Sequence, residues 1–221
     1  MKAKIRLMIE KCLRNKKKKR QLDGCDLDLY YKEVIEKEIQ EFLRNVDKDL
    51  QSKFEQVVLK IENWDLLERF FISIMNFNYQ LKLTKIHVGL RFILLCASIE
   101  SFKKFGKGTK GGSRKVFISF LKQASEEARN KILSLFEIKT DRQLSESERL
   151  DILLKYLYEK RCTFLHEGIH FRFVDEGLAT LIDTTGEHVV FFKASFEDFL
   201  RLFQDALLNN LKREIKTYEI R

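Results

Sequence analysis

The sequence has no proline, only 9 glycines and no long apolar run among its 221 residues. The lack of proline and the low glycine content argue against a loop-rich β-sandwich, a collagen-like chain and a disordered linker. The longest unbroken apolar run, Phe92 to Ala97, is far shorter than the roughly 20 residues of a membrane-spanning helix. Lysines interrupt the first residues before the apolar core of a signal peptide can form. We therefore expect a cytoplasmic protein with no membrane partner.

Cysteines are also few, and no two of them form a C-x-x-C pair. The four are Cys12, Cys25, Cys96 and Cys162. This spacing argues against a zinc ribbon and against a dithiol redox motif, and in the cytosol free thiols are expected. In contrast, the chain is 44% hydrophobic and 12% aromatic, which is enough to bury a sizeable core and argues against disorder.

Positive charge is concentrated at one end of the sequence. The formal net charge is +9, and residues 1–20 alone hold ten basic side chains and one acidic one, so the rest of the chain is neutral overall. This basic N-terminal arm is expected to be drawn to polyanions such as RNA. The candidate contacts are Lys16, Lys17, Lys18, Lys19 and Arg20. A solvated tail that aids solubility is an equally good interpretation of such a run.

Hydrophobic residues recur at three- and four-residue spacing, which is the period of an amphipathic helix. The period predicts helices over residues 28–62, 64–81, 84–105, 114–136, 146–166 and 195–217. After Gly168 the period changes to two, and residues 189–192 follow a Thr-Thr-Gly-Glu turn. We expect a mainly α fold, a helical bundle with a small β-hairpin insertion near residues 170–193. Residues 1–83 would form the basic arm and a helical extension, and residues 84–221 the helical domain.

A glycine-rich stretch at Gly106 to Gly111 has the G-x-G-x-x-G spacing of dinucleotide-binding proteins. That motif requires a preceding strand within a βαβ unit, and here a helix is expected before it, so nucleotide binding is disfavoured. The stretch is instead basic, with no acidic residue between Glu100 and Glu126. Its candidate phosphate-backbone contacts are Lys107, Lys110, Arg114 and Lys115. An ordinary solvated loop is the alternative.

The helix expected over 146–166 opens with a capping-box spacing at Ser145 and Glu148. Its apolar stripe reaches Leu157, and one turn further the stripe arrives at Arg161. A guanidinium on an apolar face needs an anionic partner or a wet cleft, because burying it alone is costly. His166 follows at the expected carboxyl end of the helix, where the helix dipole favours a protonated imidazole. A structural alternative is open: Arg161 reaches an internal carboxylate such as Glu100, and His166 caps the last turn.

The segment 161–166, RCTFLH, resembles the R-x4–6-H signature of HEPN domains, many of which are RNA endonucleases. Upstream, residues 90–102, with Ala97, Glu100 and Ser101, are similar to the Leu-rich A-x-x-E-S helix of these domains. The resemblance covers about residues 84–210 and implies an HEPN-like helical bundle. In the family the residue after the arginine is usually polar, and here it is Cys162.

The resemblance implies an endoribonuclease that needs no metal or other cofactor. His166 would act as general base on the ribose 2′-hydroxyl or as acid on the leaving oxygen, and Arg161 would hold the scissile phosphate. Glu100 and Cys162 would be supporting residues. The resemblance also implies a homodimer whose two copies line one composite cleft. A toxin or defence effector that acts on RNA, with a cognate antitoxin or regulatory protein as partner, fits this description.

Two other functions are weighed against the nuclease. A non-catalytic HEPN-like module would bind nucleic acid or a protein, with Arg161 and His166 serving only structure. A zinc hydrolase is the third, because His166 to His170 spells H-E-x-x-H. That motif needs both imidazoles on one helical face, whereas Gly168 inside it costs a helix about 1 kcal/mol and the helix is expected to end there.

Overall fold

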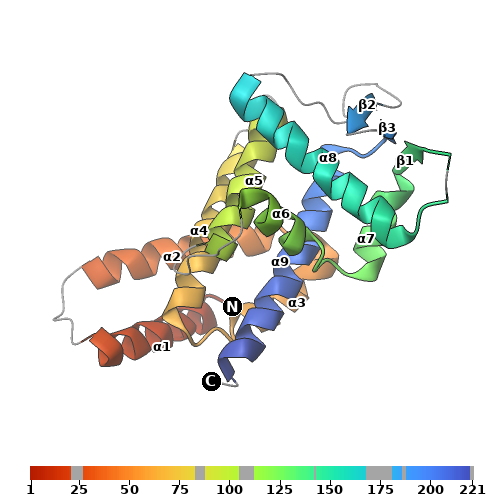
Figure 1. Cartoon of the computed structure of the whole chain (residues 1–221). Coiled ribbons are helices and arrows are strands. Elements are labelled where there is room, and N and C mark those ends of the chain that lie inside the picture. Colours follow the sequence, from red (N-terminus) through yellow and green to blue (C-terminus); the bar gives the residue numbers. More distant parts are fainter. Residues whose placement is uncertain are drawn as a thin grey trace.

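The computed structural model describes residues 1–20, 27–82, 88–104, 112–141, 143–167, 181–185 and 188–219, and these residues are mainly α-helical (Figure 1). In order, the elements are α1 (Lys2–Arg20), α2 (Leu27–Asn45), α3 (Lys48–Val58), α4 (Trp64–Lys82), α5 (Val88–Lys104), α6 (Ser113–Leu121), α7 (Glu126–Ser134), β1 (Phe136–Lys139), α8 (Glu146–Glu167), β2 (Leu181–Thr185), β3 (His188–Phe192) and α9 (Phe196–Glu219). The prediction of a mainly α fold with a small β-hairpin is confirmed.

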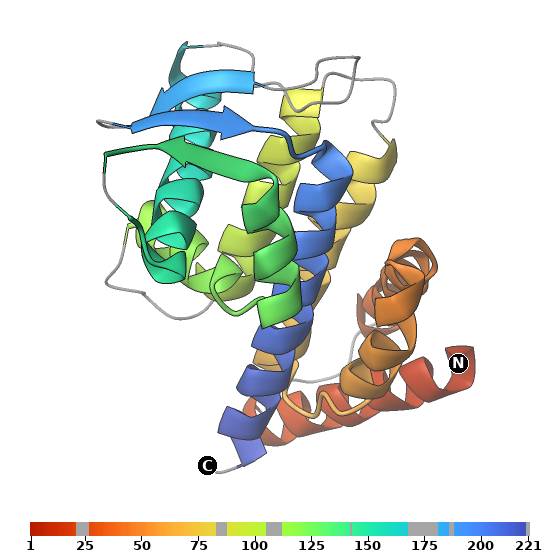
Figure 2. The same ribbon diagram turned by 90° about the vertical axis from the view of Figure 1, so that its right-hand side faces the viewer.

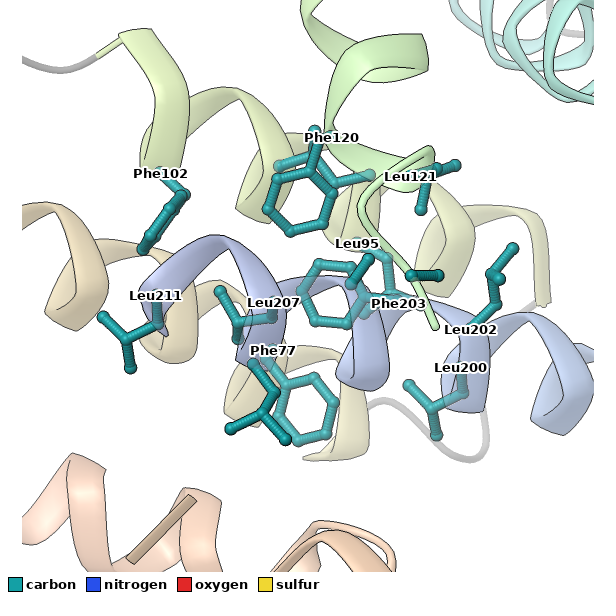
Figure 3. Close-up of a cluster of buried hydrophobic side chains, with 14 of the residues drawn as sticks. Phe77, Leu95, Phe102, Phe120, Leu121, Leu200, Leu202, Phe203, Leu207 and Leu211 are labelled. Atoms are coloured by element: carbon teal, nitrogen blue, oxygen red, sulfur yellow. The ribbon is translucent and has the colours of Figure 1, made fainter. Parts of the chain in front are cut away.

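Helix α9 forms the centre of the core and contacts α3, α4, α5, α6 and α7. It starts at a capping box in which the Asp198 N–H donates to Ser195 Oγ and the Ser195 N–H donates to Asp198 Oδ2. On its buried side, Phe203 stacks against Phe77 of α4 and Phe120 of α6, with ring centroids 5.9 and 5.8 Å apart (Figure 3). Aromatic packing of this kind fixes α4, α6 and α9 around one interior.

The basic N-terminal arm is a packed helix, which corrects the alternative of a solvated tail for residues 1–15. On α1 the side chains of Ile5, Ile9 and Cys12 are fully buried. Ion pairs then join Arg6 to Glu36 of α2 and Lys11 to Glu62. The three- and four-residue spacing of the apolar side chains was visible in the sequence, but the neighbouring lysines masked it.

Helices from both sides of the expected domain boundary share one hydrophobic core. Residues 83–84 lie outside the described residues, but α4 packs closely against α5 and α3 packs against α9. Phe42 of α2 is an example of contact across this boundary. Its ring packs edge-on against Phe77 of α4, and Phe77 stacks on Phe203 of α9. Helices α1 and α2 nevertheless lie at the opposite end of the molecule from the sheet (Figures 1 and 2).

The sheet has three antiparallel strands in the order β1-β3-β2. The hairpin β2–β3 lies within the predicted range, with Thr185 opposite His188, while the alternating residues 169–173 lie outside the described residues. Strand β1 was not predicted. The predicted single helix over 114–136 is wrong, because Ser125 caps a new helix by accepting from the Ala128 N–H, and α7 then ends at Ser134 before β1.

The predicted helix over 28–62 is also divided. Helix α2 ends at Asn45, and Asp47 caps α3 by accepting from the Asp49 N–H. The Asp47 N–H donates to Gln204 Oε1 of α9 at 3.1 Å, so the break is held by a contact that is 157 residues distant in sequence. Such a contact has no local signature, which is why the periodicity alone joined the two helices.

Candidate functional site

Helices α8 and α5 bring Arg161 and Glu100 together. Helix α8 begins at the predicted capping box, where Ser145 and Glu148 bond each other's backbone N–H groups. Its apolar stripe, Leu153, Leu154 and Leu157, is fully buried. The next turn on the same face of the helix therefore faces α5. There Arg161 Nη2 donates to Glu100 Oε1 at 2.6 Å, which is a short charge-assisted hydrogen bond.

The guanidinium of Arg161 is largely but not fully enclosed. Its side chain is 17% exposed and that of Glu100 is 22% exposed. Burial lowers the pKa of Arg161, but Glu100, Cys162, Cys96 and Tyr158 together raise it by more. The pKa therefore lies above its ordinary value, and the arginine stays charged. Within the described part of the chain, the buried Nε of Arg161 has no hydrogen-bond partner. The arginine is therefore held at Nη2 by Glu100, while its Nε donor is buried and unpaired among the described residues.

Tyr158 and Cys162 complete the surroundings of Arg161. The Tyr158 ring lies 5.5 Å from Arg161 Cζ, which is a cation–π distance. Burial and, after it, the nearby Cys162 thiol raise the pKa of Tyr158, so its hydroxyl stays protonated and can donate. Sequence reasoning missed Tyr158, although its position one turn before Arg161 on the same helical face was a usable signal. Cys162, predicted as a supporting residue, is half-buried beside both.

His166 lies in the last turn of α8 and is exposed. Five residues of helix separate it from Arg161, which corresponds to about 7.5 Å along the axis and about 140° around it. The two side chains therefore leave α8 in different directions. A single α8 therefore does not aim both side chains at one small group.

The predicted basic contacts fall in separate places. Arg114 and Lys115 are exposed at the start of α6, and Arg114 Nη2 lies 3.7 Å from Glu159 Oε1, two residues before Arg161. Arg114 thus lies beside α8, next to a side chain that is about 200° around the helix from Arg161. Lys107 and Lys110 lie outside the described residues. Residues 16–20 belong to the described part of α1, but the positions of their side chains do not. Helix α1 and the Arg161 end of α8 lie at opposite ends of the molecule (Figures 1 and 2).

The zinc and glycine motifs fall largely outside the described residues. Helix α8 is described to Glu167, while His170 and the glycine-rich stretch 106–111 are not described. Among the residues that the structure describes, no group of three or more His, Cys, Asp or Glu side chains could hold a metal ion. Cys12, Cys96 and Cys162 carry free thiols. Burial raises the pKa of Cys12 to about 12, so this thiol is protonated at neutral pH.

Comparisons with known proteins give no relative for this chain. No protein-family model, no curated protein and no solved structure matches it. In the described ranges, no helix combines the length and the hydropathy needed to cross a bilayer.

Proposed function

We propose that this chain is an HEPN-type endoribonuclease that cleaves RNA without metal, by attack of a ribose 2′-hydroxyl on the adjacent phosphate. The observation that carries the proposal is Arg161. It is fixed by Glu100 at 2.6 Å, it stays partly exposed, and its Nε donor is unused among the described residues. A positioned cation at a partly closed surface is what a phosphate in the transition state needs.

In this mechanism each residue has one task. Arg161 binds the non-bridging oxygens of the scissile phosphate and stabilises the charge that develops on them. His166, exposed at the end of α8, takes the proton from the 2′-hydroxyl or returns one to the leaving 5′-oxygen. Glu100 is a positioning residue that acts through Arg161, and Tyr158 limits the rotation of the guanidinium. The substrate supplies the nucleophile, and the products are a 2′,3′-cyclic phosphate and a 5′-hydroxyl.

A homodimer is part of the proposal, because His166 and Arg161 point about 140° apart on one helix. A two-fold axis near α8 would bring His166 of one copy toward Arg161 of the other. Exposed apolar side chains on α8 and on the adjacent helices α5 and α4 support such an interface. Leu165, one turn beyond Arg161, is 47% exposed, and Leu90 of α5 is 41% exposed. Met75 and Tyr79 of the neighbouring α4 are 40% and 56% exposed.

The substrate is RNA, and the basic residues would guide it by charge. Arg114 and Lys115 lie on the α6 end next to α8, so they would contact the strand near the cleavage point. Lys16 to Arg20 would contact a more distant part of it. A cytoplasmic location fits the free thiols of the described cysteines. A role as toxin or defence effector, controlled by a cognate antitoxin or regulatory protein, belongs to the same proposal.

The test is RNA cleavage by the purified protein in excess EDTA. We expect products with 2′,3′-cyclic phosphate ends, and loss of cleavage in both Arg161→Ala and His166→Ala. Arg149→Ala on the same helix and His188→Ala on β3 are matched controls that should still cleave when circular dichroism shows them folded. Cleavage that EDTA abolishes, or that survives in His166→Ala, would refute the mechanism.

A non-catalytic HEPN-like module is the second candidate, because Arg161 already has a carboxylate partner in its own chain. In that case the arginine would join α5 to α8 and RNA or a protein would bind elsewhere. RNA binding without cleavage, unchanged by His166→Ala, would select this candidate over the nuclease.

A further inference from the structure

A groove runs along α9 between α3 and α7, on a part of the molecule that shares no residue with the Arg161 site. Figure 2 shows α7 and α3 on the two sides of α9. Two cavities of about 510 and 560 Å³ lie in this groove. They are adjacent, since Asp49, Lys131 and Arg201 line both. The first cavity, called here the α9 cavity, is within the size range of small-molecule sites.

Four cations from three helices line the α9 cavity: Lys53 of α3, Lys131 of α7, and Arg201 and Lys212 of α9. Neither Lys53 nor Lys212 has a carboxylate partner within the part of the chain that the structure describes. Lys131 has only a 3.5 Å contact with Asp198, and its side chain is 51% exposed. Lys53 and Lys212 are thus available to a ligand, whereas Arg201 is paired with Asp47 and Asp49.

The carboxylates of the α9 cavity are mostly engaged already. Asp49 pairs with Arg201 at 3.2 Å. Asp205 accepts from the Ser125 N–H at the start of α7 and from Asn209 Nδ2. Only Glu127 has no partner in the described ranges, and it opposes an anion. The charges without a partner in the described ranges are therefore Lys53, Lys212 and Glu127. Positive charge exceeds negative charge among them, so a bound anion would be attracted to the cavity.

We propose that the α9 cavity binds a small phosphate ester with at least two negative charges. Lys53 and Lys212 would bind the phosphate oxygens, and Lys131 would add to the positive potential. Leu50, Ala128 and Leu208 also line the cavity and give the organic part of the ligand an apolar surface. This inference does not depend on the proposed nuclease activity, because none of these residues takes part in it.

The test is isothermal titration of the full chain with ATP, AMP and inorganic pyrophosphate at constant ionic strength. We expect saturable binding of ATP. In Lys53→Ala/Lys212→Ala, affinity should fall about tenfold or more, because two charge-assisted contacts are lost. In Glu127→Gln, affinity should rise roughly threefold, because a repulsive charge is removed. The double variant Lys139→Ala/Lys193→Ala removes the same charge from exposed positions on and beside β1 and β3, and should bind like the unaltered chain.

Opposite shifts in the two groove variants would support the site, since misfolding cannot tighten binding. If pyrophosphate bound as tightly as ATP, the cavity would recognise only the phosphate groups of the ligand, which would contradict a role for the apolar surface. Absence of saturable binding for all three probes would overturn the proposal. Equal losses in the groove variant and in the Lys139/Lys193 control would also overturn it, because they would show attraction to net charge only.

Discussion

Among the arginine–glutamate pairs that join helices in this molecule, Arg69–Glu214 and Arg161–Glu100 differ in how completely the guanidinium is bonded. Arg69 of α4 donates from Nη1 to the Phe102 carbonyl at 3.0 Å and from Nη2 to Glu214 of α9 at 2.9 Å. Its side chain is only 4% exposed. Arg161 donates from Nη2 to Glu100, is 17% exposed, and has an Nε with no partner among the described residues.

Under the proposed mechanism, this difference separates a structural arginine from a functional one. Arg69 links α4, α5 and α9 and also lies 5.6 Å from the Phe102 ring, so most of its bonding capacity serves the fold. Among the described residues, Arg161 links α5 to α8, and its buried Nε has no hydrogen-bond partner. Loss of Arg69 should therefore be measured in stability, and loss of Arg161 in activity.

The largest expected effect is on cleavage by Arg161→Ala. Removing the group that stabilises the phosphate should lower kcat about 1000-fold. The free energy of unfolding should fall by less than about 2 kcal/mol, because the pair is near the surface. Single-turnover cleavage and urea denaturation measure the two quantities. A cleavage rate near that of the unaltered chain would reduce Arg161 to a structural residue.

The second largest expected effect is a lower free energy of unfolding in Arg69→Ala. The change breaks a buried ion pair and leaves the Phe102 carbonyl without its donor, so we expect a loss of about 3 kcal/mol in the free energy of unfolding. Urea denaturation at pH 7 measures it. If Arg69→Ala and Arg161→Ala proved equally destabilising, the comparison between the two pairs would be wrong.

The glutamate partners should differ in the same way but less strongly. Glu100→Ala leaves Arg161 unpositioned, so kcat should fall about tenfold while KM changes little. Glu100→Gln keeps an acceptor and should restore most of the rate. Glu214→Ala serves as the matched control, with normal kcat and lower stability. A change in KM alone for Glu100→Ala would speak against a positioning role.

The smallest effect concerns Asp198, a carboxylate with no role in cleavage. Burial raises its pKa, but hydrogen bonds from Ser195 and the contact with Lys131 outweigh burial, and the pKa lies below the ordinary 3.8. Its stabilising effect is therefore complete above that value and is lost as the pH falls through the folded pKa. Asp198→Asn should cost about 1 kcal/mol at pH 7 and less at pH 3. Urea denaturation at both pH values checks this, and an equal cost at both would contradict it.

Local patterns in the sequence predicted the elements that carry the site. The Ser145–Glu148 capping box and the leucine stripe of α8 give its start and its buried face, and the stripe led to the Arg161–Glu100 pair. The capping box is a contact within one helical turn. The ion pair was predictable because a buried guanidinium needs a compensating charge. The Thr-Thr-Gly-Glu turn and the apolar residues after it identified the hairpin that contains β3.

What the sequence did not reveal depends on contacts distant along the chain. The α2–α3 break is held by Gln204, and β1 forms because β3 offers it a partner. The α9 cavity combines residues from positions 49 to 212, which no motif connects. The apolar side of α1 is an exception: its spacing was readable, but the high lysine content favoured a different interpretation.

The most direct test of the account is complementation between two inactive variants. Arg161→Ala and His166→Ala are each purified, then mixed and allowed to exchange subunits before RNA is added. If Arg161 of one copy works with His166 of the other, each heterodimer regains one intact pair, and cleavage should return to roughly a quarter of the rate of the unaltered chain. No recovery, with subunit exchange demonstrated separately, would contradict the composite site.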